Sequence, residues 1–430
     1  MRWLARWRVP VLLLAAAAVA VGPLTVQATA APPRGACNNP EPGRPVERLL
    51  PWAQEMLKPQ RAWPFSTGSG ITVAVVDSGV DADHPQLRTR GKVLPGRDFY
   101  LVGSLPGNYD CVSHGTGVAS IIAADHVADI GFQGVAPGAR ILPIRVSERE
   151  TGDTGQVEPI DPQILAKGIR YAADSGARVL NLSMSGDQDQ GPVRAAIAYA
   201  VSKDVVVVAA VGNRQGNSGD VLPSYPAQYP GVLGVGAIST TGARLQGSQF
   251  GPYVDLVAPG GSVLAATRRT GHAYSDGTSF ATPFVAATAA LVRAAYPKMK
   301  AADVIQRLKA TTTPARGGTD GSQYGAGIVD PYRAVTEGMV LTAAHQLPSM
   351  QAPPPDEHAL AIAARWRTAG DEARWMTSLA IGGTLLIIVL TALLVGGHRR
   401  RWRASRSAIT RNHEDVQTEL PPERLFARAD

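Results

Sequence analysis

The feature that most restricts the fold of this 430-residue chain is a series of short apolar runs that are rich in β-branched residues. Such nearly continuous runs are typical of strands that are buried on both faces of a parallel sheet. Helix candidates lie between the runs, and strands that alternate with helices favour an α/β fold whose mostly parallel sheet has right-handed crossovers. The expected strands are Ile71–Val76, Arg140–Val146, Val179–Leu182, Val205–Val211 and Val232–Ile238, and the expected helices are Gly115–Ala124, Pro162–Asp174, Pro192–Lys203 and Ser279–Ala295.

The N-terminal residues have the pattern of a secretory signal peptide. Arginines at positions 2, 6 and 8 precede an apolar run from Val9 to about Val21. Small residues follow this run, and Ala28-Thr29-Ala30 fits the A-x-A cleavage pattern. The alternative is an uncleaved anchor helix, but the short apolar run and the small residues after it favour cleavage.

A second apolar segment, Met376–Gly397, contains no charged residue and is long enough to span a bilayer. A basic run from His398 to Arg401 follows it directly, and Trp375 and Trp402 flank it at positions typical of the membrane interface. The alternative is a buried core helix, which is rarely followed by a run of arginines. We therefore expect a single-pass protein of the cell membrane, with the bulk of the chain outside and only the tail in the cytoplasm.

The net charge of +7 gives little support for nucleic-acid binding. The excess arginines lie at the N-terminus and after residue 397, where basic residues hold the cytoplasmic side of apolar segments. The chain between these ends is close to neutral, so we expect no nucleic-acid partner. Charged residues make up only 18% of the sequence while Gly and Pro are plentiful, which suits an extracytoplasmic enzyme and not a disordered chain.

The segments between the two ends differ in composition. Residues 31–66 are rich in Pro and Arg and show little periodicity, and we interpret them as an extension. Three consecutive prolines, at positions 353–355, mark a linker that is semi-rigid where they cluster. The expected order is a signal peptide at 1–30, an extension at 31–66, an α/β domain at 67–340, a Pro-rich linker at 341–375, a transmembrane helix at 376–397 and a cytoplasmic tail at 398–430.

Three polar residues stand at positions that suit catalysis. Asp77 follows a buried apolar run, and the carboxyl ends of parallel strands are where α/β sheets place their chemistry. His114 precedes Gly115 at the start of an expected helix, and Ser279 lies at the start of another, where the helix dipole and free N–H groups favour a developing anion. Taken singly, each residue could also have a non-catalytic role: Asp77 as a loop residue, His114 as a structural residue and Ser279 as a helix cap.

Together, and in the order Asp…His…Ser, these residues are specific, because that order is the one found in subtilisin. The sequence resembles the subtilisin-like serine proteases over roughly residues 67–335. The matching segments are VVDSGV (75–80), HGTGVA (114–119), NLSMSG (181–186), AAVGN (209–213) and GTSFATP (277–283). The resemblance implies a three-layer subtilisin-like fold and hydrolysis of peptide bonds in protein or peptide substrates.

The resemblance also implies a role for each catalytic residue. Ser279 is expected to attack the scissile carbonyl, His114 to take its proton and pass it to the leaving amine, and Asp77 to orient the imidazole. In the family an Asn at the position of Asn213 donates its side-chain amide to the oxyanion, with the Ser279 N–H as second donor. As an alternative, an Asn after Gly212 could simply be a turn residue.

Substrate binding in this family pairs an extended peptide with strand-like segments of the enzyme. The segment that begins at Ser183 is similar to the one that lines the family's main specificity pocket, and Ser224 falls near the floor of that pocket. No acidic residue occurs in these segments, so we expect no strict requirement for a basic residue before the scissile bond. The expected substrate-binding residues are Ser183, Met184, Ser185, Gly186, Gly212 and Ser224.

Two departures from the family qualify the resemblance. Many subtilisins carry a folded prodomain, and the chain between the expected cleavage site and Asp77 is too short for one. Many also bind calcium through an Asp shortly after the catalytic Asp, and here that place holds Gln86. We therefore expect no calcium at that site, no other metal and no cofactor.

The two cysteines, Cys37 and Cys111, leave alternatives open when considered alone. An exported chain with an even number of cysteines can form a disulfide, but the sequence does not show that the two Cα atoms lie within reach, so two free thiols remain possible.

The whole plan of the chain is similar to that of the mycosins, the membrane proteases of actinobacterial type VII secretion systems. That resemblance implies a disulfide between Cys37 and Cys111, an active site that faces outward, and a place in or beside the secretion membrane complex. Two alternatives remain: a general membrane-tethered degradative subtilase, and a structural subunit of the secretion complex whose protease fold is idle.

Overall fold

The computed structural model describes residues 35–37, 39–101, 105–148, 160–216, 219–316, 321–338 and 357–399. The expected signal peptide, the start of the expected linker and the tail beyond Arg399 lie outside these residues. The chain divides into two units, Met1–Ala343 and Ala344–Asp430, and each is described by itself.

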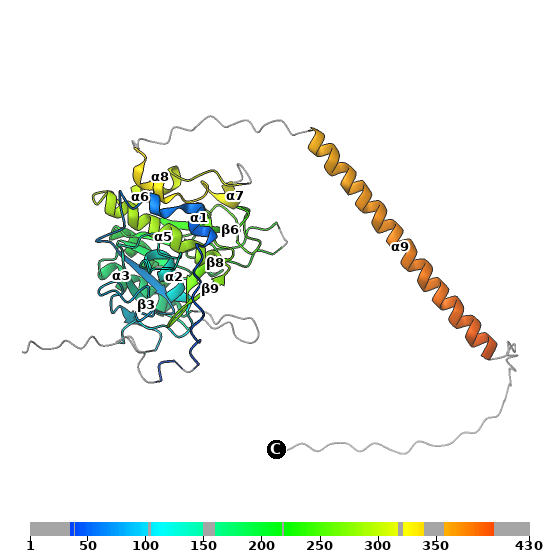
Figure 1. The fold of residues 1–430 in the computed structure, drawn as a ribbon, viewed down its shortest axis with the longest axis horizontal. Coiled ribbons are helices and arrows are strands. Elements are labelled where there is room, and N and C mark those ends of the chain that lie inside the picture. The colour runs from blue at the N-terminus through cyan, green and yellow to red at the C-terminus, as the bar shows by residue number, and fades with distance from the viewer. Residues whose placement is uncertain are drawn as a thin grey trace, which may run out of the picture. The chain divides into compact units, whose positions relative to one another are not determined.

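The first unit is built around a parallel sheet that has seven strands in the described part of the chain (Figure 1). The strand order is β2-β3-β1-β4-β5-β6-β7, and every neighbouring pair is parallel. A separate antiparallel pair, β8 and β9, lies apart from it. The strands are β1 Thr72–Asp77, β2 Arg97–Asp98, β3 Arg140–Arg145, β4 Val179–Leu182, β5 Val206–Ala210, β6 Val232–Ile238, β7 Leu256–Pro259, β8 Val263–Ala266 and β9 His272–Ser275.

The central strands β1, β4 and β5 bury every side chain, and side chains on both faces of a sheet are buried when helices cover both faces. Helices α2 and α5 pack against each other and against the strands, and α3 and α4 form a second packed pair against them. The layered α/β architecture is therefore confirmed. The helices of this unit are α1 Trp52–Leu57, the 3-10 turn Pro59–Arg61, α2 His114–Ala123, α3 Pro162–Asp174, α4 Gly191–Ser202, α5 Thr278–Ala295, α6 Ala301–Ala310, α7 Gly321–Tyr324 and α8 Pro331–Thr336.

The segment interpreted as an extension packs into the main core. Ala53, Leu57 and Ala62 are buried in the same apolar cluster as the central sheet, and the Trp52 indole donates to the Gly261 and Ser262 carbonyls at 3.1 and 2.9 Å. The expected boundary at residue 66 thus separates two segments that share one core. Periodicity did not reveal α1 because a helix of six residues is too short to repeat its apolar face.

His272, at the start of β9, joins this segment to the core through both ring nitrogens. Its Nδ1 accepts from the Glu47 N–H at 3.1 Å, and its Nε2 lies 2.7 Å from Gln86 Oε1. An imidazole that accepts at one nitrogen and donates at the other is neutral. Burial, together with the nearby His84, lowers the pKa of His272 to about 4, although Glu47 opposes the shift.

Acid should therefore destabilise the protein through His272. The imidazole binds a proton near pH 6.5 when unfolded and only near pH 4 when folded, so stability falls as the pH is lowered through this window. The expected loss is about 3 kcal/mol. Urea unfolding of the full chain between pH 4 and 7 should show a shallower pH dependence for His272→Gln than for the parent. The exposed His126 provides the control, since His126→Gln should keep the parental slope; an equal slope in His272→Gln would contradict the assignment.

The second unit contains one helix in its described residues, α9, Glu357–Arg399. The most apolar 18 residues within Ala364–Arg399 have a mean hydropathy of 2.5, and none of them is buried. This segment is therefore a candidate membrane span. The helix begins within the expected Pro-rich linker, so residues 357–375 are helical and not extended. Ala, Arg and Glu are frequent there, and all three have high helix propensity.

Candidate active site

The site begins at the carboxyl end of β1, where Asp77 is the last residue of the strand. Its side chain is 4% exposed, and the Ser78 N–H donates to Asp77 Oδ1 at 2.7 Å. The carboxylate is thus held in place by its own chain before any partner approaches. A buried carboxylate at this edge of a parallel sheet occupies the position that the sequence predicts.

His114 is the first residue of α2, and its Nδ1 lies 2.7 Å from Asp77 Oδ1. A hydrogen bond of this kind places the proton on Nδ1, so that Nε2 on the far side of the ring is the nitrogen that can accept a proton. Gly115 permits the approach, because a Cβ there would lie 2.0 Å from the Gly79 carbonyl oxygen and 3.2 Å from Asp77 Oδ1. Any larger residue at this position would push α2 away from β1.

Ser279 is the second residue of α5 and is half-buried. The next side chain along the helix, Phe280, packs edge-on against the His114 ring with 5.3 Å between ring centroids. The Ser183 hydroxyl donates to the Ser279 carbonyl at 2.7 Å, which fixes the backbone at the start of the helix. The packing of α2 against α5 therefore brings the His and Ser segments together, although they are far apart in the sequence.

Asn213 lies beside Ser279 in a fixed orientation. Its Oδ1 accepts from the Thr278 N–H at 2.8 Å and from the Thr278 hydroxyl at 3.0 Å. With Oδ1 held in this way, the amide nitrogen Nδ2 faces the space in front of Gly277. A Cβ placed on Gly277 would lie in that space, 3.1 Å from Asn213 Nδ2 and 3.3 Å from Ser279 Oγ. With φ of +140°, Gly277 keeps open a space that both polar groups border.

The expected substrate-binding residues divide into two kinds. Gly186 is exposed and pairs with Tyr225 in an antiparallel bridge, with N···O distances of 2.7 and 2.9 Å. In contrast, Met184 is only 5% exposed, and the buried Ser224 hydroxyl donates to the Val211 carbonyl at 2.8 Å. Ser183, as described above, supports Ser279. Ser185 and Gly212 lie close together, since a Cβ on Gly212 would be 2.7 Å from Ser185 Oγ.

Asp110, which lies in none of the recognised motifs, connects the segments that carry Asp77 and His114. Its buried carboxylate accepts from the Ser78 hydroxyl at 3.0 Å, from the Val112 N–H at 3.0 Å, and from the Thr116 N–H and hydroxyl at 2.9 and 2.6 Å. Ser78 in turn accepts from the Gly115 N–H at 2.9 Å. One carboxylate therefore ties the end of β1 to the first turn of α2.

Burial raises the pKa of Asp110 to about 6, in spite of the hydrogen bonds from Thr116 and Val112, which lower it. The only signal in the sequence is a set of polar residues that flank Asp77 and His114, and such residues are common in loops. Their shared partner becomes visible only when β1 and α2 meet in the fold.

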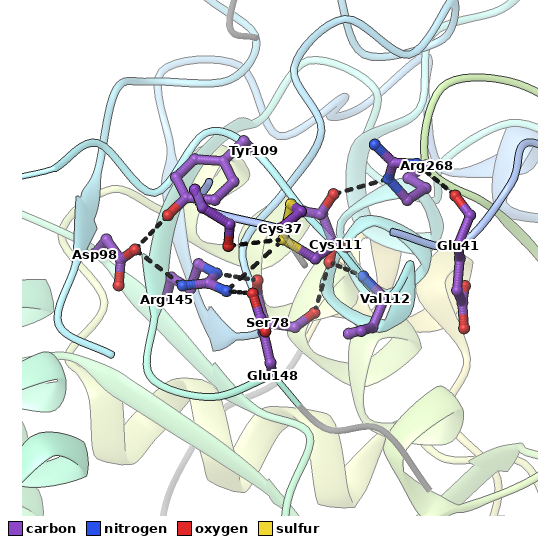
Figure 2. Close-up of a disulfide and its surroundings, with 12 residues drawn as sticks. Cys37, Glu41, Ser78, Asp98, Tyr109, Cys111, Val112, Arg145, Glu148 and Arg268 are labelled. Carbon is purple, nitrogen blue, oxygen red and sulfur yellow. Dashed lines mark hydrogen bonds and ion pairs between the residues drawn. A yellow bond between two sulfur atoms is a disulfide. The ribbon is translucent and has the colours of Figure 1, made fainter. Parts of the chain in front are cut away.

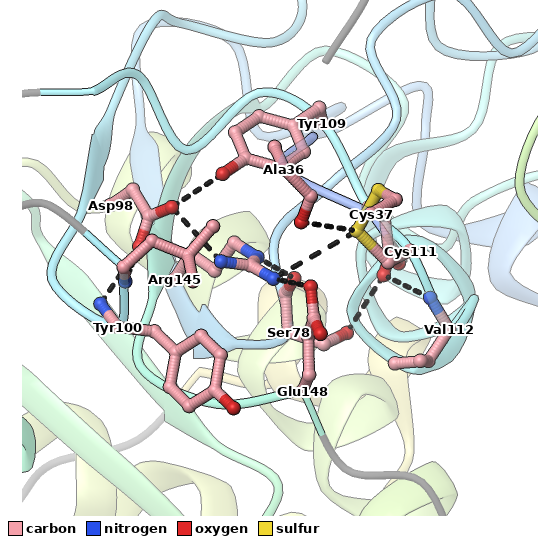
Figure 3. A network of polar contacts seen from close by, with 12 residues as sticks. Ala36, Cys37, Ser78, Asp98, Tyr100, Tyr109, Cys111, Val112, Arg145 and Glu148 are labelled. Atoms are coloured by element: carbon pink, nitrogen blue, oxygen red, sulfur yellow. Dashed lines mark hydrogen bonds and ion pairs between the residues drawn. A yellow bond between two sulfur atoms is a disulfide. The ribbon is translucent and has the colours of Figure 1, made fainter. Parts of the chain in front are cut away.

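A second buried charge, Arg145, lies on the other side of Ser78 (Figure 3). The Arg145 side chain is fully buried at the end of β3, where its Nε donates to the Ser78 carbonyl at 3.0 Å and its Nη1 to Asp98 Oδ2 at 2.9 Å. It also pairs with Glu148. Tyr109 donates to the same Asp98 oxygen at 2.5 Å, and burial raises the pKa of its hydroxyl. Buried charges of this kind are tolerated because each is paired and hydrogen-bonded.

The disulfide between Cys37 and Cys111 is confirmed (Figure 2). The two Cα atoms are 5.5 Å apart and 74 positions apart in the sequence. Closing a loop of that length stabilises the fold by roughly 4 kcal/mol on the chain-entropy account. Because Cys111 precedes His114 by three positions, the bridge attaches the N-terminal segment directly beside the loop that leads to His114.

Gln86, the residue at which we expect no calcium ligand, is engaged in protein contacts. Its Nε2 donates to the Asp125 and Phe132 carbonyls at 3.1 and 2.8 Å, and its Oε1 receives the His272 contact described above. One group of possible ligands in the described residues, Cys37, Cys111 and Glu148, has its two sulfurs joined in the disulfide. The absence of a metal and of a cofactor remains a prediction.

Comparison with known proteins agrees with this geometry. The subtilase family model matches residues 68–327. Mycosin-3 of Mycobacterium tuberculosis is 36% identical over 389 residues, which cover 74% of this chain and 81% of that protein. The crystal structure of MycP1 from the ESX-1 type VII secretion system is 31% identical, with a TM-score of 0.60 over 71% of this chain and 90% of that one.

A further solved structure, the periplasmic assembly from the ESX-5 inner membrane complex, contains a chain that is 32% identical, with a TM-score of 0.59. The match covers 73% of this chain and 90% of that one. The family match covers the segments that carry Asp77, His114, Asn213 and Ser279, and the fold of those relatives is the fold described here. The chain therefore belongs to the subtilase family of serine proteases.

Proposed function

We propose that this protein is a membrane-anchored serine endopeptidase whose catalytic triad is Asp77, His114 and Ser279. The observation that carries the proposal is the 2.7 Å contact between His114 Nδ1 and Asp77 Oδ1, beside a serine at the start of a helix. Ser279 Oγ attacks the scissile carbonyl while His114 Nε2 takes its proton, and the same nitrogen later protonates the leaving amine. Asp77 orients the imidazole and stabilises its charged form.

Asn213 and the Ser279 N–H are the proposed oxyanion donors. The anchoring of Asn213 Oδ1 by Thr278 supports this role, because it leaves Nδ2 directed at the space beside Ser279 Oγ. Donors that are fixed before the reaction stabilise developing charge without the cost of reorganisation.

Polypeptides are the proposed substrates. An extended chain is expected to run alongside the 183–186 segment, at the half-buried Ser185, because the N–H and carbonyl of Gly186 are already paired with Tyr225. The carboxylates that follow, Asp187 and Asp189, are paired with Arg214 and Arg194, each at 2.7 Å. Because both carboxylates are paired within the protein, neither should require a basic residue in the substrate.

We also propose that the enzyme acts outside the membrane, in or beside a type VII secretion complex, with its C-terminal tail in the cytoplasm. Two observations support this: α9 is a candidate membrane span, and a homologous chain is present in the ESX-5 periplasmic assembly. The alternatives are a general degradative protease tethered to the membrane and a structural subunit of the secretion complex. The proposal predicts separable contributions from catalysis and assembly.

Deleting the protein should impair export of type VII substrates more than Ser279→Ala does, because a docking surface does not depend on one hydroxyl. Export by the two strains, compared alongside native gels of the membrane complex, tests this. Equal defects with identical complexes would remove the structural role, and normal secretion in both strains would favour the degradative alternative.

A further inference from the structure

A large cavity adjoins the catalytic histidine on the side that faces the N-terminal segment. It has a volume of about 730 Å³ and is lined by His114 and Phe280, by residues from the ends of β8 and β9, and by residues 39–42 and 44 of the N-terminal segment. No residue of the 183–186 segment lines it. The cavity is therefore a second compartment of the cleft, distinct from the one where substrate binding is expected.

The segment that forms the outer wall of this cavity is held at several points. The disulfide fixes Cys37, the Glu41 N–H donates to the Cys111 carbonyl at 2.9 Å, and the Arg44 N–H donates to the Thr270 carbonyl at 3.0 Å. Figure 2 shows Arg268 between the N-terminal segment and the loop that precedes α2. Its Nε donates to the Asp110 carbonyl at 2.9 Å, and its Nη1 donates to the Glu41 carbonyl. Within the wall itself, Glu41 and Arg44 make these contacts through backbone atoms, so their side chains are not needed to hold the segment.

The position of His114 decides which part of a substrate this compartment would hold. The histidine protonates the leaving amine, so the chain that follows the scissile bond must lie on its side of the cleft. We propose that residues 39–44 form one wall of the leaving-group subsites, and that Glu41 and Arg44 select by charge the substrate residues after the scissile bond. This inference rests on the proposed catalytic function.

The charges available in the cavity support selection by Glu41 and Arg44. Both are exposed, and in the described part of the chain neither side chain is paired with another. Asp276, the other carboxylate that lines the cavity, is also exposed, and its Oδ1 accepts from the Ser262 N–H at 2.5 Å. Its charge is the same in every variant compared below, so it does not affect the comparison. Tyr274 is 58% exposed at the same surface and offers an apolar face to an extended peptide. Arg44 should favour an acidic substrate residue, and Glu41 a basic one.

Competition between water and an added amine for the acyl-enzyme measures binding in the leaving-group subsites alone, because the acyl part of the substrate stays the same. The full-length enzyme in detergent is acylated by a peptide p-nitrophenyl ester: Ser279 Oγ forms the ester bond and p-nitrophenolate leaves. An added dipeptide amide then competes with water. Its amine forms the new amide bond as the ester to Ser279 breaks, and its proton returns through His114 to Ser279 Oγ. Nucleophiles that carry Asp or Arg at either position report the charge preference without any change in the acyl part.

The Arg44→Glu variant should raise the ratio of Arg-bearing to Asp-bearing products by about three- to tenfold at low salt, as expected for exposed charges. Glu41→Lys should shift the ratio in the opposite direction. Arg48→Glu is the matched control, because Arg48 is an exposed arginine of the same segment that does not line the cavity; it should leave the ratio unchanged.

The results distinguish an error in the charge selection from an error in the proposed catalytic function. If the acyl-enzyme forms but Arg44→Glu and Glu41→Lys keep the parental ratio, or Arg48→Glu shifts it equally, the charge selection is wrong and the catalytic function stands. If no acyl-enzyme forms on Ser279, the proposed function fails and the subsite falls with it.

Discussion

Replacing Ser279 or His114 with alanine should lower kcat/KM for a peptide substrate by about 10⁴- to 10⁶-fold. The loss is expected to be similar for either residue, because the hydroxyl is a weak nucleophile unless the imidazole removes its proton. The His114–Asp77 contact of 2.7 Å makes the imidazole part of one unit with the carboxylate. Hydrolysis of an internally quenched peptide by the purified full chain provides the measurement.

A serine outside the site controls for the substitution itself. Ser175 is exposed at the end of α3, so Ser175→Ala should retain parental activity. Near-normal turnover by Ser279→Ala or His114→Ala would mean that the nucleophile or the base lies elsewhere.

The Asn213→Ala variant should lower kcat by about 10²- to 10³-fold and leave KM nearly unchanged. An oxyanion donor acts where charge develops, so its loss is felt in the transition state and hardly in substrate binding. Steady-state kinetics that separate kcat from KM test this. A change confined to KM would instead assign Asn213 to ground-state binding.

The Asn213→Asp variant distinguishes oxyanion donation from a purely structural role. A carboxylate keeps the acceptor that holds the Thr278 N–H and hydroxyl, but it removes the Nδ2 donor and brings a negative charge to the site. Activity should therefore fall at least as far as in Asn213→Ala. If Asn213→Asp were nearly as active as the parent, the residue would serve only to anchor the start of α5.

The sequence predicted the elements whose periodicity is strong and local. The strands Val179–Leu182 and Val232–Ile238 have the expected bounds, since both are buried along their whole length and consist mostly of apolar residues. Short elements leave no such pattern in the sequence: β2 has two residues, and β7 has four and ends in a proline. The candidate catalytic residues lie within recognisable motifs at the ends of these strands and helices, and their roles stay predictions.

The supporting residues could not be predicted, because their partners are distant in sequence. Arg145 looks like the ordinary end of a strand until β1 and β3 pair and place it opposite Asp77. Asp110 likewise gains its meaning from Ser78, 32 positions away. The Val211 carbonyl, which accepts from the Ser224 hydroxyl, is another partner that the sequence does not indicate, and the place of Ser224 near the pocket floor stays a prediction.

Fluorophosphonate labelling of the full-length protein, with the modified residue identified by mass spectrometry, tests the central claim most directly. The reagent reacts with a serine that an adjacent base activates, so a single adduct should form on Ser279. The adduct should be absent in Ser279→Ala and should form far more slowly in His114→Ala, while Ser175→Ala labels like the parent. An adduct on a different serine, or labelling of Ser279 at the parental rate without His114, would contradict the account.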